Sequence, residues 1–447
     1  MYLRKIKELL PVFLVTAIFI SIWLWARFII SVGVIAIIIL FLFSRNGFTI
    51  SKVKRALKQN PSFIFFIFAG ILYSANCIYL AIINHEIHNI RLLFVFANPL
   101  VLSLYTLALS HLLSKNKKYS EYLLNIFCII VSVIAILAFT YFIYYKLNGR
   151  SFLIRNFYTN LDHAGQSQDI VALCFPLASV LLFSKVLDIK HFIYKVIIVI
   201  LALIIIFSDL FLNQSKIGYL IELTVLIYYS FFLIRKFSYK NNKVIFRNLT
   251  IASVIAILTL GGGLYTTYKT SEIFHQRVSS GIHGFDKFFN KKDNNALIDG
   301  SVEVRLIYYT NSIKIFYEYP KIFIFGCPLI KKTINPWLCS QKIIAEHPRI
   351  KEDMDRLKQI PPHNEFINYT YQSGILASLS LLAFLILLFR ESRNIKSEYH
   401  ISMRCLIMAF FIGCCFEFFI TRQTNVATFF TLLGIFLSMH KIRSYKD

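Results

Sequence analysis

Long apolar runs are the feature of this sequence that most constrains its fold. They recur along most of the chain, and hydrophobic residues make up 57% of its 447 residues. A soluble domain averages about 45–50% apolar residues, so the excess is too large to be buried in soluble cores. A helix needs roughly 20 mostly apolar residues to cross a bilayer, and the runs therefore predict a membrane protein.

Twelve of the runs are candidate membrane spans. Lipid offers no water to bind backbone N–H and C=O groups, so such spans fold as helices rather than as open strands. We therefore predict an all-α polytopic membrane protein with about 12 transmembrane helices. The expected spans are residues 9–26, 28–43, 62–83, 92–113, 122–145, 168–184, 192–208, 217–234, 248–267, 368–389, 402–420 and 425–440.

Basic residues set the expected orientation. Lys and Arg outnumber Asp and Glu by 48 to 23, which gives a formal net charge of +25. With an inside N-terminus, 26 of the 48 fall on inner loops, 7 on short outer loops and 15 in one long outer segment. Cytoplasmic loops are enriched in Lys and Arg, so both termini are expected to be cytoplasmic. This distribution accounts for the charge with no nucleic acid as a partner.

The expected organisation has three parts. Residues 1–267 hold helices 1–9, residues 268–367 form a large periplasmic loop, and residues 368–447 hold helices 10–12 and a short cytoplasmic tail. Such a loop is far too long to be a turn. Within it, residues 301–318 carry apolar side chains at helical spacing, which predicts an amphipathic helix on the membrane face.

Cationic side chains lie at the outer ends of several predicted helices, and His363 lies just before helix 10. Polar groups at membrane depth are costly, which makes each of them a functional candidate. If the fold brings them together, they form a cationic pocket whose natural ligand is a lipid phosphate or pyrophosphate. The candidate cations are Arg91, Arg155, Lys216 and Arg305.

A short motif gives the segment around His363 a family resemblance. Residues 363–377 read HNEFINYTYQSGILA, which resembles the H-[NSQ]-x9-G-x-x-G signature of the O-antigen ligase family. His363 and Asn364 match, and nine residues separate Asn364 from Gly374. Ala377 replaces the last glycine of the signature.

Upstream segments extend the resemblance. SVEVRLIYY, with Arg305, is similar to the family's loop-arginine segment, and Pro320 and Gly326 resemble the P…G element that follows it. NQSKIGYL resembles a polar segment at a helix start, where Lys216 stands in place of the usual arginine. Two further residues match by topological position only: Arg91 and Arg155.

The resemblance implies a GT-C-like glycosyltransferase of the bacterial inner membrane with a site that faces the periplasm. Its donor would be a glycan on undecaprenyl pyrophosphate, and its acceptor a sugar hydroxyl of lipid A–core. His363 would orient the acceptor hydroxyl or take its proton, and Arg305 would stabilise charge on the departing pyrophosphate. Asn364 would hold the His363 ring or a sugar hydroxyl. The residues implied to bind pyrophosphate are Lys216, Arg155 and Arg91. Membrane lipids surround the protein, and no metal or cofactor is implied.

Other functions stay open on the sequence. An O-antigen polymerase shares the architecture, but polymerases tend to have two sizeable outer loops, and the other candidate here, residues 146–167, is short. A protein O-oligosaccharyltransferase would use a Ser or Thr hydroxyl as acceptor. A transporter or flippase is a different class, which discontinuous helices and internal pseudo-symmetry would favour.

Structural roles compete with functional ones for the polar residues in or near the spans. We expect Glu417 to pair with Arg422 near the outer end of helix 11, and Asp209 to pair with Lys216 across a short turn. A proton relay that includes Glu222 is the competing interpretation. For the cations, the alternative role is to anchor helix ends at lipid headgroups.

Two other patterns lie in the long loop. Cys327 and Cys339 would face an oxidising compartment, where a disulfide and two free thiols both stay open. Asp353-Met354-Asp355 resembles the D-x-D motif of metal-dependent glycosyltransferases. Basic residues surround it, which favours a solvated charged helix over a metal site.

Overall fold

Helices make up almost all of the described chain. Outside the helices and turns, the described residues contain one isolated β-bridge, between Ile395 and His440. The computed structural model describes residues 2–24, 27–43, 50–84, 98–148, 164–186, 189–213, 215–238, short pieces between 268 and 286, 301–335, 338–339, 342–343, 363–395, 399–417, 419–420 and 422–440.

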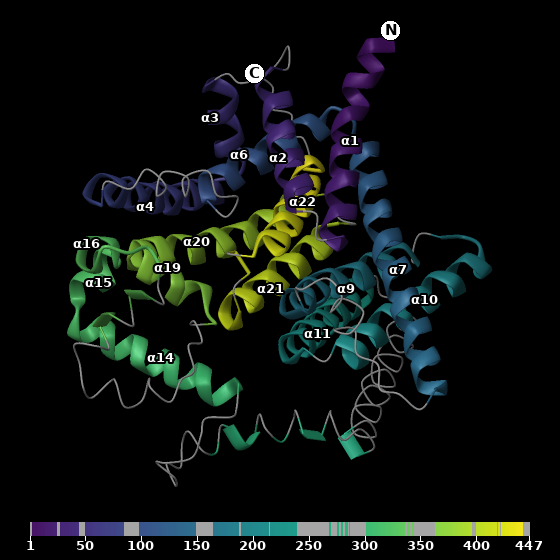
Figure 1. Cartoon of the computed structure of the whole chain (residues 1–447). Coiled ribbons are helices and arrows are strands. Elements are labelled where there is room, and N and C mark those ends of the chain that lie inside the picture. The colour runs from purple at the N-terminus through teal and green to yellow at the C-terminus, as the bar shows by residue number, and fades with distance from the viewer. Residues whose placement is uncertain are drawn as a thin grey trace. The chain divides into compact units, whose positions relative to one another are not determined.

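The apolar helices confirm an all-α chain with the character of a multi-pass membrane protein. Among the described residues, six helices are long and apolar enough to cross a membrane, and five more apolar helices are shorter. The six lie in α4 (Ser62–Ile83), α7 (Lys117–Leu147), α9 (Ala164–Val186), α10 (Phe192–Phe207), α11 (Lys216–Ser238) and α20 (Ile375–Glu391). The shorter five lie in α1 (Tyr2–Trp23), α2 (Arg27–Leu42), α6 (Pro99–Ser114), α21 (His400–Phe416) and α22 (Gln423–Ser438) (Figure 1).

Two differences from the expected spans stand out. The span expected at 368–389 is not one helix, because Gly374 separates α19 (Glu365–Ser373) from α20. The span expected at 248–267 lies outside the described residues, and the total of twelve stays a prediction. The remaining helical elements are α3 (Ile50–Gln59), η2 (Ser208–Asn213), α14 (Ser301–Glu318), α15 (Pro320–Phe325), α16 (Pro328–Lys331) and η3 (Ser392–Asn394).

The helix expected at 301–318 is confirmed, since α14 has these bounds. Its apolar side chains Val304, Tyr308 and Ile315 are buried in a core cluster with residues of the following segments. These positions recur at intervals of four and seven residues, which places them on one face of the helix.

The chain forms two compact units, each described here by itself. The first unit contains residues 1–71, 91–229 and 380–447, and the second contains residues 72–90 and 230–379. Each unit brings together segments that are distant in sequence. The organisation into three consecutive parts stays a prediction.

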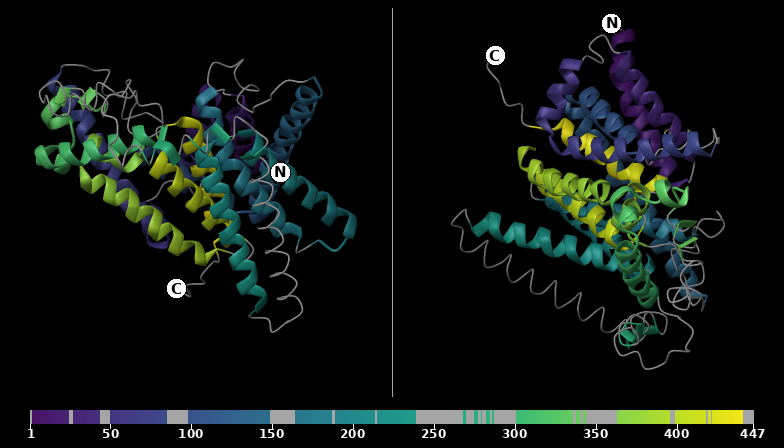
Figure 2. Two further views of the ribbon diagram at one scale, coloured as in Figure 1. Left: turned by 90° about the horizontal axis from the view of Figure 1, so that it is seen from below. Right: turned by 90° about the vertical axis from the view of Figure 1, so that its left-hand side faces the viewer.

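Helix α22 is the central element of the first unit. It packs against α1, α2, α6, α7, α9 and α21, and Figure 2 shows the yellow C-terminal helices among the purple and blue N-terminal ones. Every residue from Thr424 to Ser438 is buried. A helix that is apolar or small on all sides is suited to such a position. Three of its hydroxyls have hydrogen-bond partners, those of Thr428, Thr431 and Ser438, and the bond between Thr431 and Tyr105 is 2.7 Å long.

Stacked phenylalanine rings connect α22 to its neighbours in the first unit. The ring of Phe66 stacks on Phe384 with centroids 4.5 Å apart and on Phe430 at 5.1 Å. Phe410 stacks on Phe429 at 3.7 Å. Aromatic pairs add roughly 0.5–1.5 kcal/mol per pair to the burial of their surface.

A buried carboxylate joins the start of α4 to the end of α20. Glu391 accepts one hydrogen bond from the backbone N–H of Ser62 at 2.7 Å and one from the Ser62 hydroxyl at 2.6 Å. Charge-assisted hydrogen bonds are about twice as strong as neutral ones. The pair therefore holds together two helix ends that are 329 residues apart in sequence.

We predict that Ser62→Ala lowers the free energy of unfolding by about 1–3 kcal/mol, because one oxygen of buried Glu391 loses its donor. Thermal unfolding of the detergent-solubilised protein measures the effect. Ser114→Ala is the matched control, since the Ser114 hydroxyl is exposed and bonds only to a carbonyl of its own helix. Equal melting temperatures for the two variants would contradict the prediction.

Candidate functional site

The His363 motif corresponds to one short helix and its two ends. The Oδ1 atom of Asn364 accepts a hydrogen bond from the backbone N–H of Ile367 at 3.0 Å and so caps the start of α19. The helix covers the nine residues Glu365–Ser373 and ends at Gly374. The nine-residue spacing of the motif is therefore a helix length, which fixes the distance between its histidine and its glycine.

Two glycines let α15 and α19 meet at close range in the second unit. A Cβ atom at Gly374 would lie 2.0 Å from the carbonyl oxygen of Ile324, and one at Gly326 would lie 2.9 Å from the backbone of Gln372. Their φ angles, +82° and +88°, are ones that L side chains rarely adopt. The glycine of the P…G element and the glycine of the motif thus belong to the same contact.

The amide side chain of Asn76 bridges the ends of these two helices. Its Nδ2 atom donates to the carbonyl of Phe325 at 3.2 Å and to that of Gln372 at 3.0 Å. The backbone N–H of Cys327 donates to the carbonyl of Tyr371 at 2.7 Å. Carbonyls at helix ends lack partners within their own helix, so these bonds satisfy them and fix the contact.

Cys327 and Cys339 form a disulfide, an outcome that the sequence left open. Both are fully buried and belong to the core cluster that contains Val304, Tyr308 and Tyr371. The disulfide ties the segment after α15 to a core whose other members come from α14, α15 and α19, together with Ile343. The arrangement holds α14 and α19 in one small cluster.

Arg305 and His363 lie on elements that one hydrogen bond joins. The hydroxyl of Tyr309 donates to the backbone carbonyl of His363 at 2.8 Å. Arg305 precedes Tyr309 by four residues, and side chains four residues apart lie on the same face of a helix. The face of α14 that carries Arg305 is therefore the one directed toward His363, and both side chains are partly exposed.

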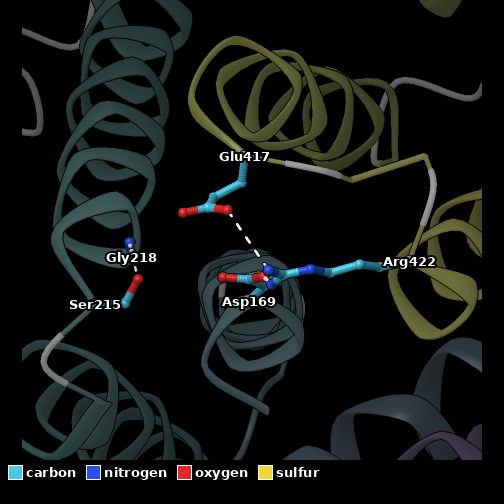
Figure 3. A network of polar contacts seen from close by, with 5 residues as sticks. All are labelled: Asp169, Ser215, Gly218, Glu417 and Arg422. Carbon is cyan, nitrogen blue, oxygen red and sulfur yellow. Dashed lines mark hydrogen bonds and ion pairs between the residues drawn. The ribbon is translucent and has the colours of Figure 1, made fainter. Parts of the chain in front are cut away.

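A second polar cluster lies in the first unit, around the short π-helix η2. Asn213 donates from Nδ2 to Oδ1 of Asp209 at 2.8 Å. Ser215 caps α11, since its hydroxyl oxygen accepts from the backbone N–H of Gly218 at 3.2 Å (Figure 3). A Cβ atom at Gly218 would lie 3.0 Å from Asn213 and 3.3 Å from Asp209. π-helices are rare and are frequent at functional sites.

Arg422 forms ion pairs with two carboxylates of the first unit. It pairs with Asp169 of α9 and, at 3.6 Å, with Glu417 at the end of α21 (Figure 3). Burial lowers the pKa of the Arg422 guanidinium to about 10, so the side chain keeps its charge at neutral pH. The expected pairing of Glu417 with Arg422 is confirmed. The contact with Asp169 was not expected from the sequence.

The remaining predicted residues are placed as follows. Lys216 is the first residue of α11 in the first unit, and its side chain lies outside the described part of the structure. The predicted pairing of Lys216 with Asp209 is therefore untested. The D-x-D segment also lies outside the described residues, as do Arg91 and Arg155.

Sequence reasoning missed two residues that organise the site in the second unit, Tyr309 and Asn76. Tyr309 has a signal in the sequence, because it lies one helical turn after Arg305. For Asn76 the only signal is that it is an amide within an apolar run. Its partners could not be inferred, because they lie 249 and 296 residues away. Within the described ranges, no group of three or more His, Cys, Asp or Glu side chains is arranged to hold a metal ion.

The comparisons with known proteins provide no family assignment. No protein-family model matches this sequence, and no curated protein matches it.

We predict that Gly374→Ala lowers the free energy of unfolding by at least about 2 kcal/mol. The new Cβ would overlap the Ile324 carbonyl, and the positive φ would be strained as well. Leu376→Ala is the control, because this side chain is half exposed and lies two residues away. A Gly374→Ala protein as stable as the control would show that α15 and α19 do not meet in this way.

Proposed function

We propose that this chain is a membrane glycosyltransferase of the O-antigen ligase type. It would move a glycan from undecaprenyl pyrophosphate to a sugar hydroxyl of lipid A–core at the periplasmic face of the bacterial inner membrane. The proposal rests on the motif resemblance together with the geometry of the second unit.

The observation that carries the proposal is the hydrogen bond from Tyr309 to the His363 carbonyl. The two residues implied to act in catalysis, His363 and Arg305, are 58 positions apart in sequence. The bond from Tyr309 joins the helix of one to the backbone of the other. A general base and a cation on facing elements are what transfer from a pyrophosphate donor requires.

Two further features agree with the proposed location. The described helices are long and apolar enough for a multi-pass membrane protein. The Cys327–Cys339 disulfide agrees with a loop exposed to an oxidising compartment such as the periplasm. The distribution of Lys and Arg supports the same orientation.

The proposed reaction is a single displacement at the anomeric carbon of the donor glycan. The acceptor hydroxyl oxygen attacks the anomeric carbon of the donor glycan and forms the new glycosidic bond. The bond from that carbon to the pyrophosphate oxygen breaks, and its electron pair leaves with undecaprenyl pyrophosphate. The hydroxyl proton passes to the imidazole of His363, which would act as the general base.

Charge on the departing pyrophosphate is the main barrier that cations can lower. Arg305 would contact it, and the motif resemblance alone implies Lys216, Arg155 and Arg91 as pyrophosphate ligands. Preorganised charges of this kind are often the largest catalytic contribution. Asn364 caps the start of α19. We propose that it also contacts a sugar hydroxyl or the His363 ring.

A transporter is the second candidate, and one observation favours it. The helix break at Gly374 separates α19 from α20, and broken helices are common at transporter binding sites. In this chain, the helix break at Gly374 also lets α15 pack closely against α19. This packing is a sufficient structural reason for the break. An O-antigen polymerase and a protein O-oligosaccharyltransferase differ from the ligase in acceptor, and the experiment below separates them.

We predict that deletion of the gene removes every ladder band from a lipopolysaccharide gel while lipid-linked polysaccharide accumulates. His363→Ala in the deletion strain should fail to restore the ladder because the base is missing. His283→Ala, an exposed histidine of the same long segment, should restore it. A single repeat on the core would indicate a polymerase. An unchanged ladder after deletion would refute both lipopolysaccharide functions, and a restored ladder with His363→Ala would remove His363 from the mechanism.

We predict a smaller effect for Tyr309→Phe, which removes only the hydroxyl that binds the His363 carbonyl. Loss of one such bond costs about 1 kcal/mol, so the rate of glycan transfer in membranes should fall roughly fivefold. Tyr317→Phe is the control, since Tyr317 is on the same helix and 88% exposed. Equal rates for the two variants would mean that this bond does not position His363.

A further inference from the structure

The first unit contains a glutamate that no hydrogen-bond donor reaches. Glu222 of α11 is fully buried, and neither of its carboxylate oxygens has a hydrogen-bond donor among the described residues. Glu391 provides a contrast, because this buried glutamate receives two donors from Ser62. A buried carboxylate without donors is strongly unfavourable, so the environment of Glu222 requires an explanation.

The carboxyl group of Asp209 lies on the face of α11 that carries Glu222. A Cβ atom at Gly218, one helical turn before Glu222, would lie 3.3 Å from the Oδ1 atom of Asp209, and the two carboxyl groups interact electrostatically. Asp209 is fully buried in η2, and its Oδ1 atom already accepts from Asn213. Its Oδ2 atom has no donor among the described residues. Gly218, between them in sequence, has no side chain to separate η2 from the start of α11.

Two ionised carboxylates cannot stabilise each other in this position. An ionised carboxylate is only an acceptor, so neither group has a hydrogen to give to the other. Like charges in contact, away from water, repel strongly, and such a pair retains one proton. That proton removes one charge and forms the missing hydrogen bond.

Among the side chains that the structure describes, none forms an ion pair with Asp209 or Glu222. Cys174 of α9 lies near Asp209, and Cys405 of α21 lies near Glu222. Arg404, next to Cys405, donates instead to the hydroxyls of Ser392 at 2.9 Å and Tyr228 at 3.2 Å.

We propose that Asp209 and Glu222 form a buried site that binds one proton between the two carboxyl groups. Its ligand is a proton rather than a metal ion, because a hard cation takes about six oxygen ligands. The pair offers three carboxylate oxygens without donors. The inference is independent of the glycosyltransferase proposal, since transfer from a pyrophosphate donor needs no bound ion.

Proton binding has a structural consequence for the start of α11. The shared proton joins η2 to α11, and its loss leaves two negative charges in contact across Gly218. Lys216, the first residue of α11, lies six positions before Glu222. The proton therefore holds in place the helix end that carries this predicted ligand.

Infrared difference spectroscopy of the purified full-length protein tests the site directly. Wild type at neutral pH should show the carbonyl band of a protonated carboxylic acid, and Asp209→Asn and Glu222→Gln should each lose it. Glu391→Gln is the matched control and should keep the band, because Glu391 has two donors and needs no proton. A wild-type spectrum without the band, or a band unchanged in Glu222→Gln, would overturn the proposal.

A second measurement uses the unaltered protein and does not depend on the folding of any variant. Dicyclohexylcarbodiimide reacts with protonated carboxyl groups in apolar surroundings, so mass spectrometry should find it on Glu222 or Asp209 and not on Glu391. The reaction is repeated with sodium chloride in place of choline chloride. Equal labelling in both salts supports a proton site. Protection by sodium would mean that a metal cation occupies the pair, and an absence of labelling at both residues would also overturn the proposal.

Discussion

Polar groups that lie away from water must find partners, and this requirement organises both units of the protein. In the first unit, Ser62 gives two donors to Glu391, and Arg422 pairs with Asp169. In the second unit, Asn76 satisfies carbonyls at the ends of two helices. An unpaired group of this kind costs more than a satisfied one contributes. These contacts therefore determine which segments lie together more strictly than apolar packing does.

The close contact between α15 and α19 explains why the sequence signature contains a glycine at a fixed spacing from its histidine. Gly374 and Gly326 belong to elements that are separate in sequence. Gly374 lets the backbone of α15 approach the end of α19, and Gly326 lets the backbone of α19 approach the end of α15. The helix between Asn364 and Gly374 sets the spacing, and the core cluster with the Cys327–Cys339 disulfide holds α14 alongside. The motif is therefore a support that presents His363, in addition to any chemistry it performs.

The two proposals assign different roles to different units. The second unit carries the candidate base and the loop arginine. The first unit carries a carboxyl pair and the start of the helix to which Lys216 belongs. The role of the carboxyl pair follows from a physical rule, because a charged group in an apolar environment persists only when it has a partner or a ligand.

The sequence by itself determined the class of the fold and most helix positions, because apolar runs and helical spacing are local properties. It also located α14, the motif around His363 and the pairing of Glu417 with Arg422, residues that are close in sequence. Only the tertiary structure decided the helix break at Gly374, the ion pair of Asp169 with Arg422 and the lack of a described hydrogen-bond donor at buried Glu222. These depend on which backbones and side chains approach one another in the folded chain, and no local pattern encodes such approaches.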